Sequence, residues 1–222
     1  MSSVSLVCTV HGEIGLANVS GLWKILKHFQ PDVCFLEVPP AALDNYINTV
    51  NEQTLESMAI KKYRESHQVE LVPVDLATPG GEFFANSRYM FERIERSSHE
   101  YRRLMDLNSS FVGTHGFAYL NSEDCSNIWS AIYREIRSAV ERLEDRRLVE
   151  LYEMWIATIA LRDQEMIRNV ENYSRLNMFE KGVFLVGASH RQSIIDCAGG
   201  QSGVDSNSIQ WDFDGLRTFG AS

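Results

Sequence analysis

Residues 183–190 read VFLVGASH, an almost continuous apolar run that stops at a small turn and a histidine. Residues 33–40, VCFLEVPP, have the same character and carry one carboxylate near their end. Such runs are typical of parallel strands that are covered on both faces. Shorter strand-like segments occur at 5–10, 69–76 and 209–213, and a proline in the second of these favours a position near a sheet edge. The sequence therefore predicts a mostly parallel central sheet.

Helical patterns separate these strands. Apolar residues three or four positions apart, or helix-like composition, occur at 22–29, 41–50, 53–66, 82–107, 129–143 and 147–176. Residues 108–126, by contrast, have the composition of a loop. We expect a single α/β domain over residues 1–222, with the sheet flanked by helices. A large helical insertion, roughly 82–176, is expected between the early strands and the late strand.

The composition limits the classes of partner. The chain has 222 residues and a formal net charge of −9. A protein that binds nucleic acid or an anionic membrane needs a basic face, which this net charge disfavours. No apolar run approaches the roughly 20 residues of a membrane span, and no signal-peptide pattern is present. The four cysteines form no C-x-x-C pair, which favours free thiols in a reducing, cytoplasmic setting. We expect a small-molecule or peptide substrate, no nucleic acid and no membrane partner, and leave a homo-oligomer open.

Polar residues follow four of the predicted strands. They are His11 (with Glu13 close behind it), Glu37, Asp75 and His190. Because the carboxyl ends of parallel strands meet at one edge of a sheet, these side chains are expected to converge there. Imidazoles and carboxylates together can hold a divalent metal or supply a general base. Each residue alone has a plainer alternative, such as a surface histidine or a carboxylate that caps a helix.

Charged residues also fall on the apolar stripe of the last long helix. Arg162 and Asp163 come three and four residues after Ile159 and so lie on its buried side. Charged residues are rarely buried without partners, and sequence neighbours on a helix pair poorly with each other. We expect partners from the strand ends, although a purely structural ion pair between helix and sheet is an equal alternative. His115, in the glycine-flanked stretch 113–116, is either a substrate-binding residue or a plain loop histidine.

The order of these motifs resembles the TraB/TIKI-type superfamily, with its erythromycin-esterase-like and ChaN-like relatives. Members typically have a G-x-x-H at the first strand, a glutamate at the end of the second, an arginine–aspartate pair on a late helix and a second G-x-x-H. Here the matching positions are residues 8–11, Glu37, Arg162 with Asp163, and residues 187–190. Cys8 stands where the first motif has glycine. The resemblance covers roughly residues 4–40 and 155–196.

The resemblance implies an α/β core with a histidine–glutamate site. TIKI-like members use a metal to hydrolyse peptides, esterase-like members hydrolyse an ester without a metal, and ChaN-like members bind haem. Our first hypothesis is a hydrolase in which His11, Glu37 and His190 hold a divalent ion (Mn, Co or Zn) or orient a water directly. The alternatives are metal-free hydrolysis and a non-enzymatic protein that binds haem or another small molecule at the same edge.

The remaining candidates receive catalytic roles under this hypothesis. Glu13 or Glu37 is expected to act as general base, and Arg162 to stabilise the oxyanion that forms in the transition state. Asp163 is expected to hold a histidine or the arginine in place. His115 is the candidate substrate-binding residue.

Overall fold

The computed structural model describes residues 2–49, 53–76, 80–200 and 209–216. It is built on a five-stranded sheet in the order β3-β2-β4-β1-β5, in which every neighbouring pair is parallel. The strands are β1 (Ser3–Thr9), β2 (Val33–Leu36), β3 (Glu70–Pro73), β4 (Lys181–Gly187) and β5 (Gln210–Asp212). The predicted α/β class with a parallel sheet is confirmed, and the proline-containing strand β3 lies at an edge, as expected.

The two apolar runs that suggested the fold occupy the middle of the sheet. Strand β4 pairs with β1 on one side and with β2 on the other, so that Phe184 is in register with both Leu6 and Phe35. All three of these side chains are buried. Continuous burial on both faces is the reason that these strands read as unbroken apolar runs.

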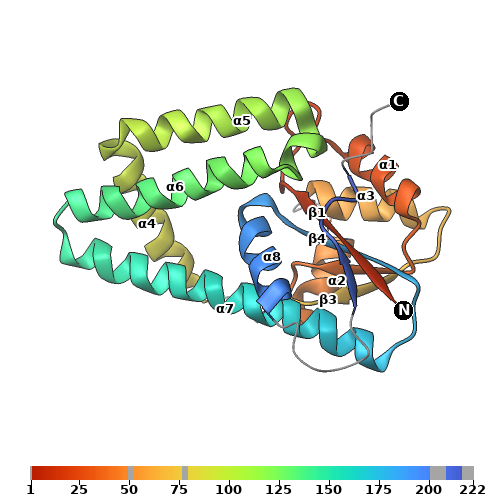
Figure 1. Ribbon diagram of the computed structural model, residues 1–222. Coiled ribbons are helices and arrows are strands. Elements are labelled where there is room, and N and C mark those ends of the chain that lie inside the picture. Colours follow the sequence, from red (N-terminus) through yellow and green to blue (C-terminus); the bar gives the residue numbers. More distant parts are fainter. Residues whose placement is uncertain (1, 50–52, 77–79, 201–208, 217–222) are drawn as a thin grey trace.

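Helices cover the two faces of the sheet (Figure 1). The helices of the described residues are α1 (Val19–Phe29), α2 (Leu43–Asn48), α3 (Leu55–Arg64), α4 (Gly81–Ser97), α5 (His99–Leu120), α6 (Glu123–Arg142), α7 (Arg146–Leu176) and α8 (Arg191–Gly200), with short 3₁₀ turns η1 (Pro40–Ala42) and η2 (Ala188–His190). Helix α4 and the adjoining ends of α5, α6 and α7 extend beyond the sheet (Figure 1). Neighbouring residues of β2 face opposite sides. The ring of Phe35 packs edge-on against Tyr173 of α7, while Tyr63 of α3 lies near Cys34.

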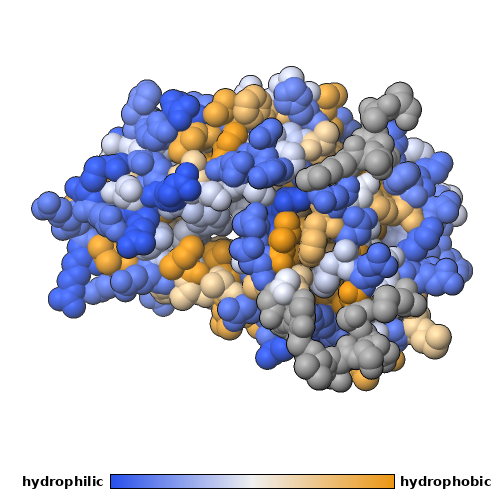
Figure 2. Space-filling view, viewed as in Figure 1, coloured by the Kyte–Doolittle hydropathy of each residue, from blue (hydrophilic) through white to orange (hydrophobic). Residues whose placement is uncertain are grey.

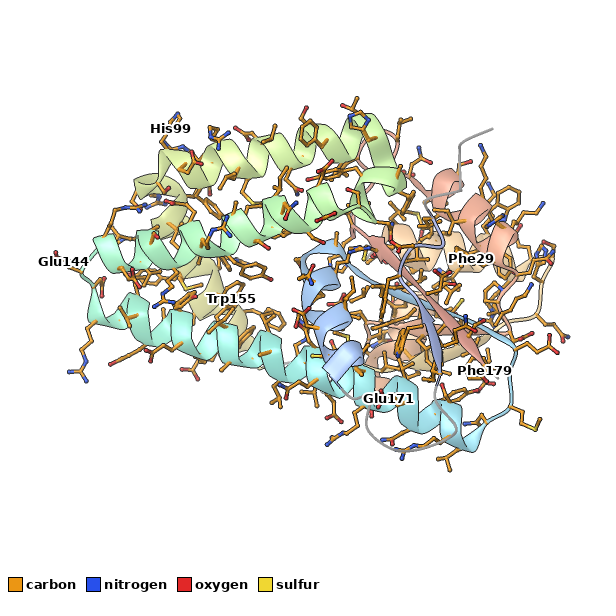
Figure 3. The ribbon with its side chains drawn as sticks, in the orientation of Figure 1. Phe29, His99, Glu144, Trp155, Glu171 and Phe179 are labelled. Atoms are coloured by element: carbon orange, nitrogen blue, oxygen red, sulfur yellow. The ribbon has the colours of Figure 1, made fainter. Side chains whose placement is uncertain are left out.

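The predicted helical insertion is present as α4 to α7, between β3 and β4. It has its own apolar core, in which Trp155 of α7 stacks on Tyr133 of α6 with ring centroids 5.6 Å apart. Figure 3 shows Trp155 between these two helices. Helix α7 continues into the main core, where Met166 and Val170 are fully buried. One 31-residue helix therefore contributes to both cores.

The expected loop at 108–126 is wrong, because α5 continues across a kink at Gly116 to Leu120 and α6 begins at Glu123. The glycines that suggested a loop serve a close contact instead. A Cβ atom at Gly116, which has φ +56°, would lie 2.8 Å from the backbone of Leu16, and one at Gly15 would lie 2.3 Å from the carbonyl oxygen of Gly113. Glycine is needed here for left-handed backbone and for the approach of two chain segments.

No helix within the described ranges is long and apolar enough to cross a membrane. The four cysteines are free thiols, and Cys8, Cys34 and Cys125 are buried. Burial raises the pKa of the Cys34 thiol to about 12, so that it remains protonated and unreactive at neutral pH.

Candidate active site

Glu37 follows β2 directly and lies at the centre of a buried ionic cluster. Its Oε1 accepts a hydrogen bond from Arg162 Nη2 at 2.8 Å, and its Oε2 accepts one from the backbone N–H of Gly187 at 2.8 Å. Burial alone would raise the pKa of this carboxyl. The charge of His190, the Gly187 N–H and Arg162 together hold the pKa below its usual value. Glu37 is therefore ionised at neutral pH, although its side chain is only 10% exposed.

The glycine of the second G-x-x-H motif permits this arrangement. A Cβ atom at Gly187 would lie 3.3 Å from Glu37 Oε2, so that a larger residue would crowd the carboxylate. The 3₁₀ turn η2 follows at once and carries His190, whose ring is buried. His190 Nε2 lies 3.4 Å from Glu37 Oε1. The motif thus brings both a backbone donor and an imidazole to one carboxylate.

Arg162 joins helix α7 to the ends of two strands. Its Nε and Nη2 donate to the carboxylate of Asp75 at 2.7 to 3.2 Å, while Nη2 also donates to Glu37. Burial opposes the charge of Arg162, but the hydrogen bonds to Asp75 and the charge of Glu37 raise its pKa further. Arg162 remains cationic, and its partners come from the strand ends, as expected from its place on the buried stripe.

Asp163 binds a different partner from its neighbour Arg162. Its Oδ1 lies 2.6 Å from His190 Nδ1, and both residues are buried. Burial lowers the pKa of His190, but the hydrogen bond to Asp163 and the charges of Glu37 and Asp163 outweigh it and raise the pKa. We call these residues the strand-tip cluster: Glu37, Asp75, Arg162, Asp163 and His190.

His11 lies at the end of β1 and pairs with a carboxylate that sequence reasoning missed. Its Nδ1 is 3.4 Å from Glu56 Oε1, and the same oxygen accepts a hydrogen bond from Thr9 Oγ1 at 2.7 Å. The His11 side chain is 73% exposed, whereas that of Glu56 is 6% exposed. The hydrogen bond to Glu56 raises the pKa of His11, although burial of part of the ring opposes it. A solvent-accessible imidazole is thus held by a buried carboxylate.

His11 and Glu37 line the same cavity, which has a volume of about 440 Å³. We call it the His11 cavity. Its other polar walls include Glu56 and Tyr46, while much of the remainder is apolar. The Tyr46 hydroxyl accepts a hydrogen bond from Thr54 Oγ1 at 3.4 Å, and burial raises the pKa of Tyr46, which keeps its proton on the phenol oxygen. A base, a carboxylate and a hydroxyl therefore meet in a space of the size that holds small ligands.

Two predicted site residues lie elsewhere. Glu13 is exposed, and its Oε1 accepts a hydrogen bond from the Val19 N–H at 2.8 Å, so that it caps the start of α1. His115 is exposed on α5 with its ring centroid 5.9 Å from that of Phe111. Neither residue lines the His11 cavity. The structure therefore brings together six of the residues selected from the sequence and leaves these two apart.

Glu56 could not be selected as a site residue from the sequence, because its position in a helix already explains a carboxylate. Glu56 is in the first turn of α3, two residues after the N-cap Thr54. A carboxylate at a helix N-terminus is favourable there without any other role. Only the structure shows that its side chain is buried against Thr9 and His11, and that its second oxygen lacks a hydrogen-bond partner among the described residues.

The predicted metal ligands do not form a complete ligand set in this arrangement. Both oxygens of Glu37 accept hydrogen bonds from cationic or backbone N–H groups, and His190 Nδ1 is bound to Asp163. Over the part of the chain that the structure describes, no group of three or more His, Cys, Asp or Glu side chains is arranged to hold a metal ion. The metal stays a prediction.

Comparisons with known proteins do not identify a family. No family model matches the chain, and no curated protein matches it. A crystal structure of a Bacillus cereus protein is similar over 83% of this chain and 57% of its own, with 12% identity and a TM-score of 0.32. The chain thus spans little more than half the length of that protein, and a TM-score this low assigns neither a fold family nor a function to the chain. The TraB/TIKI-type resemblance stays a prediction.

Proposed function

We propose that the protein is a hydrolase that cleaves an ester or peptide bond in the His11 cavity. The observation that carries this proposal is the His11–Glu56 pair, which shares one cavity with the ionised Glu37. An accessible imidazole oriented by a buried carboxylate is an arrangement suited to general-base catalysis.

His11 is the proposed base. Its Nδ1 faces Glu56, so that a neutral ring keeps its proton on Nδ1 and leaves the Nε2 lone pair to take a proton from water. Glu56 then stabilises the imidazolium, and Glu37 adds a second negative charge from the same cavity. Thr9 holds Glu56 in position through its hydroxyl.

The proposed reaction uses one water and no covalent enzyme intermediate. The water oxygen attacks the carbonyl carbon while its proton passes to His11. Tyr46 accepts a hydrogen bond from Thr54, so that its own proton is available to stabilise the developing oxyanion. The C–O or C–N bond then breaks, and the leaving oxygen or nitrogen takes the proton from His11.

The strand-tip cluster positions Glu37 in this scheme. The Nε and Nη2 groups of Arg162 are directed at carboxylates, and Arg162 does not line the His11 cavity. We therefore assign Arg162 a positioning role in place of the oxyanion role expected from the sequence. Asp163 acts one step further away, by holding His190 beside Glu37.

Metal-dependent hydrolysis is the alternative proposal for the same residues. Its test is elemental analysis of wild type and of His190→Ala after dialysis against mixed Mn, Co and Zn. About one equivalent retained by wild type and lost from the variant supports it. Binding of haem is a further alternative, which a Soret band on reconstitution would reveal. We also propose a cytoplasmic location, because the four cysteines are free thiols.

The experiment for the hydrolase compares kcat/KM of wild type, His11→Ala and His115→Ala on 4-nitrophenyl butyrate and on a fluorogenic peptide library. We expect a loss of about 10²- to 10⁴-fold for His11→Ala, the contribution typical of a general base. His115→Ala is the matched histidine control, because it is exposed and lies outside the cavity. Activity that persists in His11→Ala, with the fold intact by circular dichroism, contradicts the assignment.

A further inference from the structure

A second cavity, of about 470 Å³, lies among helices α6, α7 and α8. We call it the interhelix cavity; Figure 2 shows the surface hollowed near these helices. Its walls include Trp129 and Tyr133 from α6, and Ile156 and Ile159 from α7. The proposed hydrolysis uses none of these four residues. The volume and the mainly apolar walls are those of a small-molecule site.

Two carboxylates add negative charge to this apolar space. Asp163 lines it with a side chain that is 1% exposed, and Asp196 lines it from an exposed position on α8. Asp163 Oδ1 is bound to His190, but no described residue donates a hydrogen bond to Oδ2. Asp196 Oδ1 accepts a hydrogen bond from Gln192 Nε2 at 2.9 Å. Both carboxylates therefore keep acceptor capacity for a ligand.

No lysine or arginine is among the described residues that line the cavity. Arg191 is the nearest cation along α8, and its Nη1 donates to Ser126 Oγ, a wall residue, at 3.4 Å. Its Nη2 donates to the Phe213 carbonyl at 3.1 Å, and Arg191 itself is not part of the wall. The wall thus combines aromatic rings with negative charge and lacks a positive group.

We propose that the interhelix cavity binds a small organic ammonium ion, a protonated amine carried on an apolar body. The ammonium group donates hydrogen bonds to Asp163 and Asp196, and the faces of Trp129 and Tyr133 attract it further. The rings of Trp129 and Tyr133 lie 6.1 Å apart, centroid to centroid, and so form one aromatic wall. The apolar body packs against the isoleucines of α7. An anionic ligand of the same shape is repelled by both carboxylates.

Isothermal titration calorimetry with three probes of one shape tests the proposal: 2-phenylethylamine, 2-phenylethanol and phenylacetate. We expect the amine to bind about tenfold more tightly than the alcohol, the gain of one charge-assisted hydrogen bond, and phenylacetate to bind most weakly. Asp196→Asn is expected to remove most of the preference for the amine without changing the affinity for the alcohol. Asp44→Asn, which removes an exposed carboxylate on helix α2, is the charge-matched control.

A steric variant localises the binding. Ala160 is exposed on α7 and lines the cavity, so that Ala160→Phe fills the space with little risk to the fold. We expect this variant to lose amine binding and His11→Ala to retain it, which separates the inference from the proposed hydrolysis. Equal affinity for amine and alcohol, or unchanged amine binding in Asp196→Asn or Ala160→Phe, overturns the proposal.

Discussion

Replacing Arg162 by methionine removes the cation that two strand ends share. Glu37 and Asp75 are 10% and 6% exposed, and both lose hydrogen bonds of 2.7 to 3.2 Å to the guanidinium. His190 still faces Glu37, whereas Asp75 keeps only the Leu76 N–H among its partners in the described part of the chain. Breaking a buried pair by removing one partner costs about 3–5 kcal/mol. At about 2–4 °C per kcal/mol for a chain of this size, Tm falls by about 6–20 °C.

The assay is urea unfolding followed by circular dichroism at pH 7.5. Arg168→Met is the matched control, because Arg168 is on the same helix and pairs with Glu165 at a position that is 64% exposed. We expect the control to change the free energy of unfolding by at most about 0.5 kcal/mol. The deficit of Arg162→Met should shrink toward pH 4, where the unpaired carboxylates can take up protons. Equal stability of the two variants at pH 7.5 refutes the reasoning.

Three further results are expected. Glu56→Gln should lower the pKa of His11, measured by NMR titration of the ring, because the carboxylate is the main cause of the raised value; an unchanged pKa contradicts the pairing. The folded-state pKa of His190 is raised, so the stability that its protonation adds is present below about pH 6.5 and is lost as pH rises through the folded-state pKa. The difference in unfolding free energy between wild type and His190→Gln should therefore become smaller at alkaline pH. A difference that grows at alkaline pH is inconsistent with the charged pair. Gly116→Ala should destabilise the protein by about 1–2 kcal/mol or more in urea unfolding, because its Cβ would crowd Leu16. Gly113→Ala is the control; its Cβ meets only ordinary contacts, so it should be neutral or slightly stabilising. If Gly113→Ala were the more destabilising of the two, the close approach of Gly116 to Leu16 would not require glycine.

Much of the sheet could be predicted because its strands are buried on both faces. The runs at 33–38 and 183–187 are apolar for a physical reason that operates locally, and Pro73 marks the edge strand. The helix end at 108–120 could not be predicted in the same way. Glycines at 113 and 116 resemble a loop in sequence, but Gly116 is required by its close contact with Leu16, which is distant in the chain.

The residues of the candidate site likewise differ in whether the local sequence could predict them. Glu37 and Arg162 could be selected because a charge in an apolar stretch requires a partner, and each turns out to be the partner of the other. Glu13 and His115 were selected from their neighbours in sequence, a histidine and two glycines, and the structure places neither in the His11 cavity. Glu56 escaped because its position in a first helical turn already explains a carboxylate.

The place of β4 in the sheet has a consequence for the order in which the protein assembles. The strand that separates β1 from β2 is the fourth to be synthesised, so that residues 3–9 and 33–36 have no common neighbour until the chain has reached residue 187. The edges of these apolar strands therefore stay unpaired in a nascent chain while the four long helices α4 to α7 are synthesised. The backbone donor of Gly187 and the ring of His190 arrive with β4, which means that Glu37 receives these two partners only when the sheet closes. Chaperone dependence and slow refolding are the expected costs of this topology.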